Sequence, residues 1–174
     1  MSLYEKYVLP KFLNCTCGSR PVERQRKKVV PLAGGKVLEI GIGSGLNIPF
    51  YDKSKIVEVW GLDPSDALCE MAKKVAFKES LEINFISSGA EEIPLPNNHF
   101  DTVLITYTMC TIPEVLRAND EIRRVLKSEG KMIFCEHGVA PDENIRKWQN
   151  RINPYWGMLA GGCNINRDIP SLIE

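Results

Sequence analysis

A glycine-rich turn follows the first apolar run of the chain. The segment from Val37 to Asn47 reads VLEIGIGSGLN and places Gly41, Gly43 and Gly45 at alternate positions. Glycine is needed where the backbone takes a positive φ or must approach a ligand without a Cβ in the way. A turn from a strand into a helix is also where open α/β sheets bind nucleotides. The turn therefore predicts a site for a nucleotide-containing cofactor.

The residues around the glycines indicate which cofactor it is. A dinucleotide fingerprint, G-x-G-x-x-G, would require glycine where this chain has Leu46. In addition, Glu39 stands two residues before Gly41, inside a run that reads as a buried strand. A buried carboxylate is costly unless it meets a cation or several hydrogen-bond donors. The pattern favours a cofactor with an ammonium group, and an NAD-type oxidoreductase is the alternative.

Short β-branched runs alternate with segments of helical period from Lys36 onward. This alternation predicts βαβ units on a doubly wound parallel sheet, the α/β class. The predicted strands are Lys36–Ile40, Ile56–Leu62, Ile83–Ser87, Thr102–Tyr107 and Lys131–Glu136, and the predicted helices between them are Asn47–Asp52, Ser65–Glu79 and Pro113–Ser128.

The two longer helices have distinct signals. The helix from Ser65 begins with a capping residue after a proline. The helix from Pro113 is predicted to stop before the Glu129-Gly130 pair. Its apolar face is predicted to contain Val115, Leu116, Ile122, Val125 and Leu126.

Several segments together resemble one enzyme family. They are Glu39-x-Gly41-x-Gly43-x-Gly45, the acid Asp63 after the second strand, Ala90–Pro96, Phe100–Val103 and Arg124–Gly130. These segments resemble the motifs of class I S-adenosylmethionine-dependent methyltransferases, in the type 11, or ubiquinone-biosynthesis-like, branch. The resemblance implies a Rossmann-like sheet of strand order 3-2-1-4-5. The family's C-terminal antiparallel strands are missing, since no strand pattern follows Glu136.

Segments at both ends narrow the resemblance further. Tyr4, Tyr7–Pro10, Arg20-Pro21, Gln25-Arg26 and Gly161–Asp168 are similar to motifs of small methyltransferase-like proteins, some of which methylate alkyl thiols. The implied reaction moves a methyl group from S-adenosyl-L-methionine to a small-molecule acceptor, such as a thiol or a lipid-like compound, and leaves S-adenosyl-L-homocysteine. A cofactor-binding protein without transferase activity is a further alternative.

The resemblance also implies which residues bind the cofactor. Glu39 would lie near the methionyl ammonium and Asp63 would bind the ribose hydroxyls. The family often has an acid for the adenine amino group where this chain has Gly89, so Glu91 or backbone carbonyls would take that contact. The full predicted set is Glu39, Gly41, Gly43, Gly45, Asn47, Asp63, Pro64, Ala90, Glu91 and Thr106.

Catalytic candidates lie where strands four and five end. Methyl transfer from a sulfonium requires the two reactants to be held in line, and positioning alone is worth roughly 7 kcal/mol. Tyr107 follows the fourth strand and His137 follows the fifth. Tyr107 either faces the ligands or caps the core. His137 is either a base or an orienting hydrogen-bond partner.

Charge and cysteine content limit the possible partners. The 22 Lys and Arg balance 22 Asp and Glu, which disfavours nucleic acid as a partner. The basic segment Arg20–Lys28 is interpreted as a solvated helix face, with an anionic surface or substrate as the alternative. The six scattered cysteines favour a reducing, cytoplasmic location, and the Cys15–Cys17 pair has no matching partners for a metal site. No transmembrane or signal segment is predicted.

The chain is predicted to form one methyltransferase domain over residues 1–174. Residues 1–34, with a helix over Leu3–Leu13, would cap a sheet core of residues 35–137, and residues 138–174 would form a helical tail. Within the tail, the Asn144–Leu159 helix carries Trp148, which either walls an acceptor pocket or packs on the core. Since the final Asp168–Glu174 segment starts like a capped helix and stops, we expect a truncated tail. The edge of strand five would be paired with another copy, covered by the Asn144–Leu159 helix, or completed by further residues.

Overall fold

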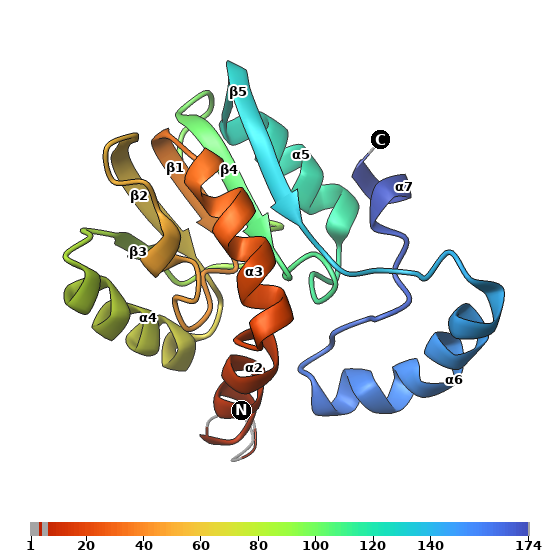
Figure 1. The fold of residues 1–174 in the computed structure, drawn as a ribbon. Coiled ribbons are helices and arrows are strands. Elements are labelled where there is room, and N and C mark those ends of the chain that lie inside the picture. The colour runs from red at the N-terminus through yellow and green to blue at the C-terminus, as the bar shows by residue number, and fades with distance from the viewer. Residues whose placement is uncertain (1–3, 5–6, 174) are drawn as a thin grey trace.

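A five-stranded parallel sheet forms the centre of the fold (Figure 1). The computed structural model describes Tyr4 and residues 7–173. The strand order is β3-β2-β1-β4-β5, which confirms the predicted 3-2-1-4-5 arrangement. The strands are β1 (Gly35–Ile40), β2 (Ile56–Leu62), β3 (Asn84–Ile86), β4 (Phe100–Thr106) and β5 (Leu126–Cys135).

The central strand β1 fixes where the site forms. It pairs in parallel with β2 on one side and β4 on the other, so that Glu39 lies opposite Gly61 and Leu104. Because all pairs are parallel, the carboxyl ends of the strands meet at one edge. The loops that follow the strands are therefore brought together there, which is the edge where open α/β sheets bind ligands.

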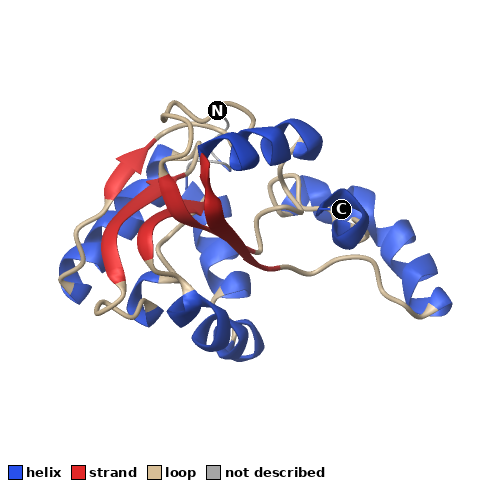
Figure 2. Ribbon diagram, turned by 90° about the horizontal axis from the view of Figure 1, so that it is seen from above, coloured by secondary structure: helices blue, strands red, loops and turns tan. Residues whose placement is uncertain are grey.

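Helices cover both faces of the sheet (Figure 2). Cores form on each side because β1 and β4 are buried almost throughout. One core joins Val30 and Ala33, just after helix α3 (Arg20–Val29), to the sheet residues Val37 and Leu104. Another packs the sheet against the helices α5 (Val115–Val125) and α7 (Ile169–Ile173).

The helix α4 (Asp66–Glu79) confirms the predicted helix from Ser65. The Ser65 hydroxyl caps it by accepting a hydrogen bond from the Leu68 N–H. Its buried residues include Ala72 and Ala76. Because these side chains are small, the helix packs closely on the glycine-rich turn. A Cβ on Gly45 would lie 3.0 Å from the Ala72 Cα.

The prediction for α5 is partly wrong. The helix ends at Val125, and Glu129-Gly130 lies within β5 instead of stopping a helix. Leu116 is 68% exposed, whereas Ala118 and Asn119 are buried. Leu116 directly follows the buried Val115, and one residue turns a helix by about 100°, so the two cannot share a narrow face. Positions 115, 118–119, 122 and 125 follow the helical period.

The predicted helix over Asn47–Asp52 is also wrong. A single 3₁₀ turn, η2 (Ile48–Phe50), occupies this segment. Pro49 supplies no N–H to the turn, and Tyr51 is already extended. This matters for the site, because the short turn brings the Tyr51 hydroxyl back to β1.

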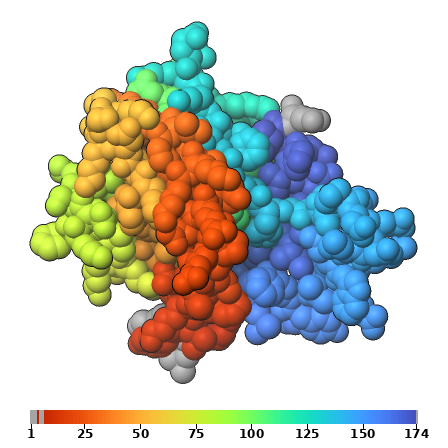
Figure 3. All heavy atoms as spheres, in the orientation of Figure 1, coloured from red at the N-terminus to blue at the C-terminus, as the bar shows by residue number. Residues whose placement is uncertain are grey.

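The N-terminal segment covers the middle of the face seen in Figure 3, with α3 in orange and the residues before it in red below. Helix α2 spans Leu9–Cys17, so it contains the second half of the predicted Leu3–Leu13 helix and continues beyond it. In the first half, Tyr4 and Tyr7 are also helical. Leu3, Glu5 and Lys6 of that prediction lie outside the described residues. A short 3₁₀ turn, η1 (Val30–Leu32), then joins α3 to β1. None of the described helices combines the length and the apolar character needed to span a bilayer.

The C-terminal helix α6 (Glu143–Leu159) projects away from the sheet (Figures 1 and 2). It buries no residue, and Trp148 is 65% exposed, so neither role predicted for that tryptophan is seen. The helix does not cover β5. Within the described residues, β5 pairs only with β4, and its other edge has no strand beside it.

Candidate functional site

A cavity of about 410 Å³ opens at the carboxyl ends of the strands. It is bounded by the loops after β1, β2, β3 and β4 and is covered by α2. The predicted site residues that line it are Gly41, Gly43, Asp63, Pro64, Ala90, Glu91, Thr106 and Tyr107. The predicted residues that do not line it are Glu39, Gly45, Asn47 and His137.

The glycine-rich turn presents its backbone to the cavity. Gly43 has a φ of +55°, and a Cβ built there would meet only the Gly41 carbonyl oxygen, at 3.8 Å. A side chain at this position would therefore project into open space on the cavity wall. By contrast, a Cβ on Gly41 would collide with the side chain of Thr108. Gly43 therefore leaves space on the cavity wall, and Gly41 leaves space for Thr108 of the loop after β4.

Asp63 joins the turn to the end of β2. Its Oδ2 accepts a hydrogen bond from the Gly43 N–H at 3.0 Å, and its Oδ1 accepts one from the Ser65 N–H at 2.8 Å. Burial raises the pKa of Asp63, and these two backbone hydrogen bonds oppose that shift. The carboxylate is thus held in one orientation beside the cavity, with acceptor capacity left for a ligand hydroxyl.

Glu39 is placed differently from the prediction. The side chain is 1% exposed and does not line the cavity. Its Oε1 accepts a hydrogen bond from the Asn47 amide at 2.9 Å, and its Oε2 accepts one from the Tyr51 hydroxyl at 2.6 Å. Burial raises the pKa of Glu39 to about 7, and the Tyr51 hydrogen bond and the Arg26 charge oppose the shift. Glu39 therefore organises polar side chains behind the cavity.

Arg26 is the site residue that sequence reasoning missed. It belongs to the segment interpreted as a solvated face, yet it is only 5% exposed and it lines the cavity. Its Nη1 donates to the Asn47 Oδ1 at 2.6 Å and to the Thr106 hydroxyl at 2.5 Å. Asn47 in turn donates to Thr106 at 2.9 Å, so the three side chains form one network with Glu39.

The charge of Arg26 is only partly compensated within the protein. Burial lowers the pKa of the guanidinium, and the Glu39 charge opposes this. The Nε is buried and has no hydrogen-bond partner among the described residues. The guanidinium lines the cavity and donates to the neutral Asn47 and Thr106 side chains, so the arrangement favours an anionic ligand group.

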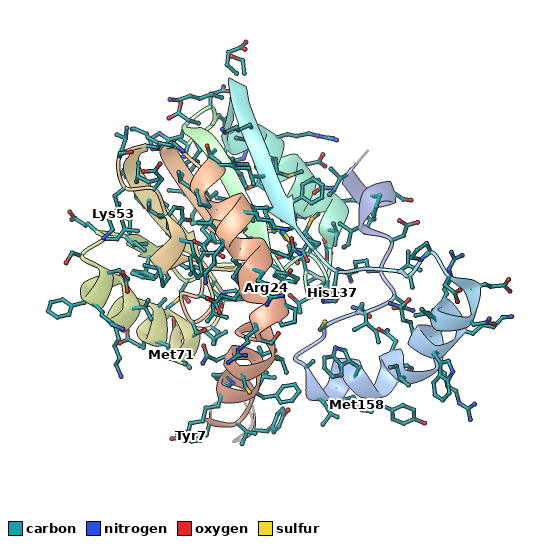
Figure 4. All side chains as sticks on the ribbon, in the orientation of Figure 1. Tyr7, Arg24, Lys53, Met71, His137 and Met158 are labelled. Atoms are coloured by element: carbon teal, nitrogen blue, oxygen red, sulfur yellow. The ribbon has the colours of Figure 1, made fainter. Side chains whose placement is uncertain are left out.

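The sequence did contain a signal for Arg26. Positions 22, 26 and 30 fall on one face of a helix, and that face is otherwise apolar, with Val22 half-buried and Val30 buried. The exposed basic residues of α3, such as Arg24, lie on the other faces (Figure 4). Because Arg26 was interpreted only as part of the basic segment, its position on the buried face of the helix was overlooked.

Tyr107 sits on strained backbone at the end of β4. Its φ of +55° lies in the left-handed region, which is rare for a bulky side chain. The ring lies 5.2 Å from the Arg26 guanidinium carbon and stacks on the His137 ring at 6.3 Å. Burial raises the pKa of the Tyr107 hydroxyl, and a hydrogen bond from the Cys135 thiol adds to this. Tyr107 therefore faces the cavity as a neutral phenol.

His137 follows β5 but does not reach the cavity (Figure 4). Its Nε2 lies 3.4 Å from the Cys163 Sγ, and this contact raises the pKa of the imidazole. The neighbouring Glu136 accepts hydrogen bonds from the Thr108 and Met109 N–H groups at 2.7 and 3.0 Å. Because its ring nitrogen is engaged by a thiol, the placement of His137 does not support the predicted role as a base toward a ligand in the cavity.

Ala90 and Glu91 line the cavity from the loop after β3. Ala90 is buried, and Glu91 accepts a hydrogen bond from the Glu114 N–H at 3.3 Å. A Cβ on Gly89 would meet the Glu91 carboxylate at 2.7 Å. Gly89 therefore leaves the room into which the Glu91 carboxylate folds.

The family of the chain follows from comparison with known proteins. The family model of the methyltransferase domain, Methyltransf_11, matches residues 38–134, more than half of the chain. The chain belongs to this family of methyltransferase domains. The matched span contains the cavity-lining strand ends and excludes Arg26 and Cys163. An NAD-type oxidoreductase is not favoured by this membership.

Curated relatives are methyltransferases acting on different acceptors. A phosphatidylethanolamine N-methyltransferase of Cereibacter sphaeroides is 31% identical over 68% of this chain and 59% of its own length. The human thiol S-methyltransferase TMT1B is 30% identical over 78% of this chain and 57% of its own length. The chain thus spans little more than half the length of these relatives.

A solved structure shows the same fold. The YcgJ protein of Bacillus subtilis superposes with a TM-score of 0.69 at 23% identity, over 85% of this chain and 62% of its own. This similarity supports the Rossmann-like arrangement of the sheet and its helices.

Proposed function

We propose that this chain binds S-adenosyl-L-methionine in the cavity and transfers its methyl group to a small-molecule acceptor. The observation that carries the proposal is the placement of three groups around one cavity: the open backbone at Gly43, the fixed carboxylate of Asp63 and the partly unpartnered guanidinium of Arg26. Together they suit a ligand that has hydroxyls at one point and an anionic group at another.

The cofactor's parts match this arrangement in order. The ribose hydroxyls donate to Asp63, which retains acceptor capacity. The methionyl carboxylate pairs with Arg26, whose planar donors suit a carboxylate. The adenine lies between Ala90 and Glu91, where Glu91 accepts from its amino group. Thr106 would be available to the amino group of the methionyl part, and Glu39 would offset charge from behind Asn47 and Thr106.

The acceptor side of the cavity is apolar. Leu9, Pro10 and Leu13 of α2 line it, together with Ile112 after β4. This lining supports an uncharged, apolar acceptor, and we propose an alkyl thiol as the class. When bound, the cofactor would supply an electrophilic methyl group: transfer would form a bond from the acceptor sulfur to the methyl carbon and break the sulfonium S–CH₃ bond, and the thiol proton would leave to solvent. A thiol with a pKa near 8.5 ionises readily enough that positioning supplies most of the effect.

Tyr107 is the side chain we propose to position the acceptor. Its phenol faces the cavity and stays neutral, so it offers a hydrogen-bond donor to an acceptor sulfur. We also infer a reducing, cytoplasmic location for the protein. All six cysteines are free thiols, and the buried Cys110 and Cys163 are held with their sulfur atoms 3.4 Å apart.

Calorimetry with Asp63→Ala tests the cofactor site. We expect affinity for S-adenosyl-L-methionine to fall about 10- to 100-fold, the loss of about 1.5–3 kcal/mol in hydrogen bonds to a charged group. Asp66→Ala is the matched control, because Asp66 is exposed, lies three residues away and does not line the cavity. Equal affinity in both variants would contradict the site.

Labelled methyl transfer tests the acceptor. The chain is incubated with labelled S-adenosyl-L-methionine and, separately, with an alkyl thiol, a phenol and an amine lipid. We expect methylated thiol as the main product. Normal cofactor binding with no product from any of the three would instead support a cofactor-binding protein without transferase activity.

A further inference from the structure

Three side chains with metal-binding atoms meet beside the cavity. Cys110 follows β4, His137 follows β5, and Cys163 follows α6. The Cys163 Sγ lies 3.4 Å from the Cys110 Sγ and 3.4 Å from the His137 Nε2, and all three atoms lie within 4.8 Å of one another. Among the described residues no other group of three such side chains converges in this way.

The backbone holds these side chains in place from three directions. Gly161 and Gly162 have φ values of +60° and +86°, and this turn reverses the chain after α6 so that Cys163 faces inward. Asn164 then donates through its N–H, at 2.9 Å, and its amide, at 3.2 Å, to the Cys110 carbonyl. Arg167 donates to the Ile112 carbonyl at 2.6 Å. The two thiols are therefore positioned before any ligand arrives.

We propose that Cys110, His137 and Cys163 form a binding site for a soft divalent cation, with Zn²⁺ as the best match. Ligands at Zn–S of 2.3 Å and Zn–N of about 2.0 Å, in a tetrahedron, lie about 3.5–3.8 Å from one another. Two of the three separations here are already 3.4 Å, so Zn²⁺ needs only small side-chain movements. Thiolate and imidazole are also the ligands that zinc prefers over Mg²⁺ or Ca²⁺.

The two thiols and the polar atoms next to them are buried. Cys110 is 2% exposed and Cys163 is 8% exposed. Next to them, the Glu136 Oε2 and the Trp156 Nε1 are buried without a hydrogen-bond partner among the described residues. Two thiolates would neutralise the charge of Zn²⁺, and the carboxylate and the indole N–H flank the ligands as an acceptor and a donor for outer contacts.

The site has three protein ligands, so the fourth position of a tetrahedron is left for water or another small ligand. The site also lies directly behind the cavity wall. Thr111, which follows Cys110, and Gly161, in the turn before Cys163, both line the cavity. A bound cation would fix α6 and the chain after it to the loop that follows β4. This inference does not depend on the proposed methyl transfer.

Zinc content of the reduced protein tests the proposal. The chain is loaded with Zn²⁺ under a non-metal-binding reductant, dialysed and analysed for metal. We expect about one zinc per chain, falling at least about tenfold in Cys163→Ser and in Cys110→Ser because each removes a thiolate ligand. Cys15→Ser is the matched control, since it removes an exposed thiol outside the cluster. Circular dichroism of each variant checks that it is folded.

Two further measurements locate the metal. Co²⁺ in place of Zn²⁺ should give the intense visible bands of a tetrahedral thiolate site, lost in His137→Ala. Zinc should also slow alkylation of Cys110 and Cys163 by iodoacetamide at least about tenfold, while Cys15 reacts as before. Zinc retained equally by all variants, lost in Cys15→Ser, or absent from the reduced wild-type chain would overturn the proposal.

Discussion

The cofactor side and the C-terminal side of the molecule differ in how far they are completed by the described chain. Around the glycine-rich turn, Glu39, Asn47, Thr106 and Tyr51 are linked by hydrogen bonds that also include Arg26, and within the described part of the chain the buried Arg26 Nε has no partner. On the C-terminal side, α6 buries no residue and the outer edge of β5 has no strand beside it.

The two sides are positioned in different ways: the cofactor side by the ends of neighbouring strands, and the C-terminal side by contacts between segments far apart in the sequence. The cofactor side is built from loops that a parallel sheet must bring together, so its chemistry follows from the fold. The C-terminal side depends on a turn more than 50 residues from the thiol it meets, the separation between Cys110 and Cys163. We therefore expect changes on the cofactor side to abolish binding and changes on α6 to leave it intact.

The largest effect is expected for Gly43→Val. A β-branched residue at a φ of +55° is strained by roughly 1–3 kcal/mol, and its side chain would project into the cavity. We expect cofactor affinity to fall at least about 100-fold in a chain that remains folded by circular dichroism. Gly157→Ala, inside α6, has room for its Cβ and should bind normally. Normal binding by Gly43→Val would show that the turn does not touch the cofactor.

Arg26→Met should come next. The substitution keeps the length of the stem but leaves Asn47 and Thr106 without their shared donor. We expect affinity for S-adenosyl-L-methionine to fall about 10- to 100-fold, with a smaller loss for an analogue that lacks the carboxylate. Arg24→Met on the exposed face of α3 serves as the control. If the analogue and the cofactor lose affinity equally, Arg26 does not bind the carboxylate.

A weaker, pH-dependent effect is expected for Glu39→Gln. The pKa of Glu39 is about 7 in the folded chain and is 4.5 for an ordinary glutamate. Between these values the folded state holds a proton that the unfolded state has released, so this group lowers stability as pH rises from about 4.5 to 7. Glu39→Gln should flatten the slope in denaturant titrations over that window, and Glu70→Gln, exposed on α4, should not. An unchanged slope in Glu39→Gln would mean that the residue does not titrate there.

The smallest effect is expected for Trp148→Lys. The side chain is 65% exposed on α6, outside the cavity. Surface substitutions of this kind usually change stability by less than about 0.5 kcal/mol. Both the cofactor dissociation constant and the melting temperature should match those of the unaltered chain. A marked loss of cofactor affinity would show that α6 contributes to cofactor binding.

The sequence predicted the sheet well because its signals are local. Short apolar runs predicted the strands, and the family resemblance implied their order. Asp63, Gly41 and Gly43, which were predicted as site residues, line the cavity. Two kinds of prediction were less successful. Leu116 was assigned by residue type where helical period decides, and Arg26 was hidden in a basic run although its face is apolar.

The thiol cluster could not be predicted from spacing. Cys110, His137 and Cys163 come from three separate segments, and no short motif joins them. The Gly161-Gly162 turn, with its two positive φ values, brings Cys163 to the other two side chains. The sequence analysis considered a metal site only at Cys15–Cys17, the one pair of cysteines close in sequence. Cys110, His137 and Cys163 are close only in the folded chain.

The pairing of β1 has a consequence for the order of folding. Val37 meets Val59 of β2 across a loop of 22 residues but meets Thr102 of β4 across one of 65. Closing the longer loop costs about 1 kcal/mol more chain entropy. Strands β1 and β2 are therefore expected to pair before β4 joins β1. Because Thr106 and Tyr107 line the cavity at the end of β4, we expect the cavity to be complete only after this longer closure, so the rate at which ligand binding appears during refolding would report it.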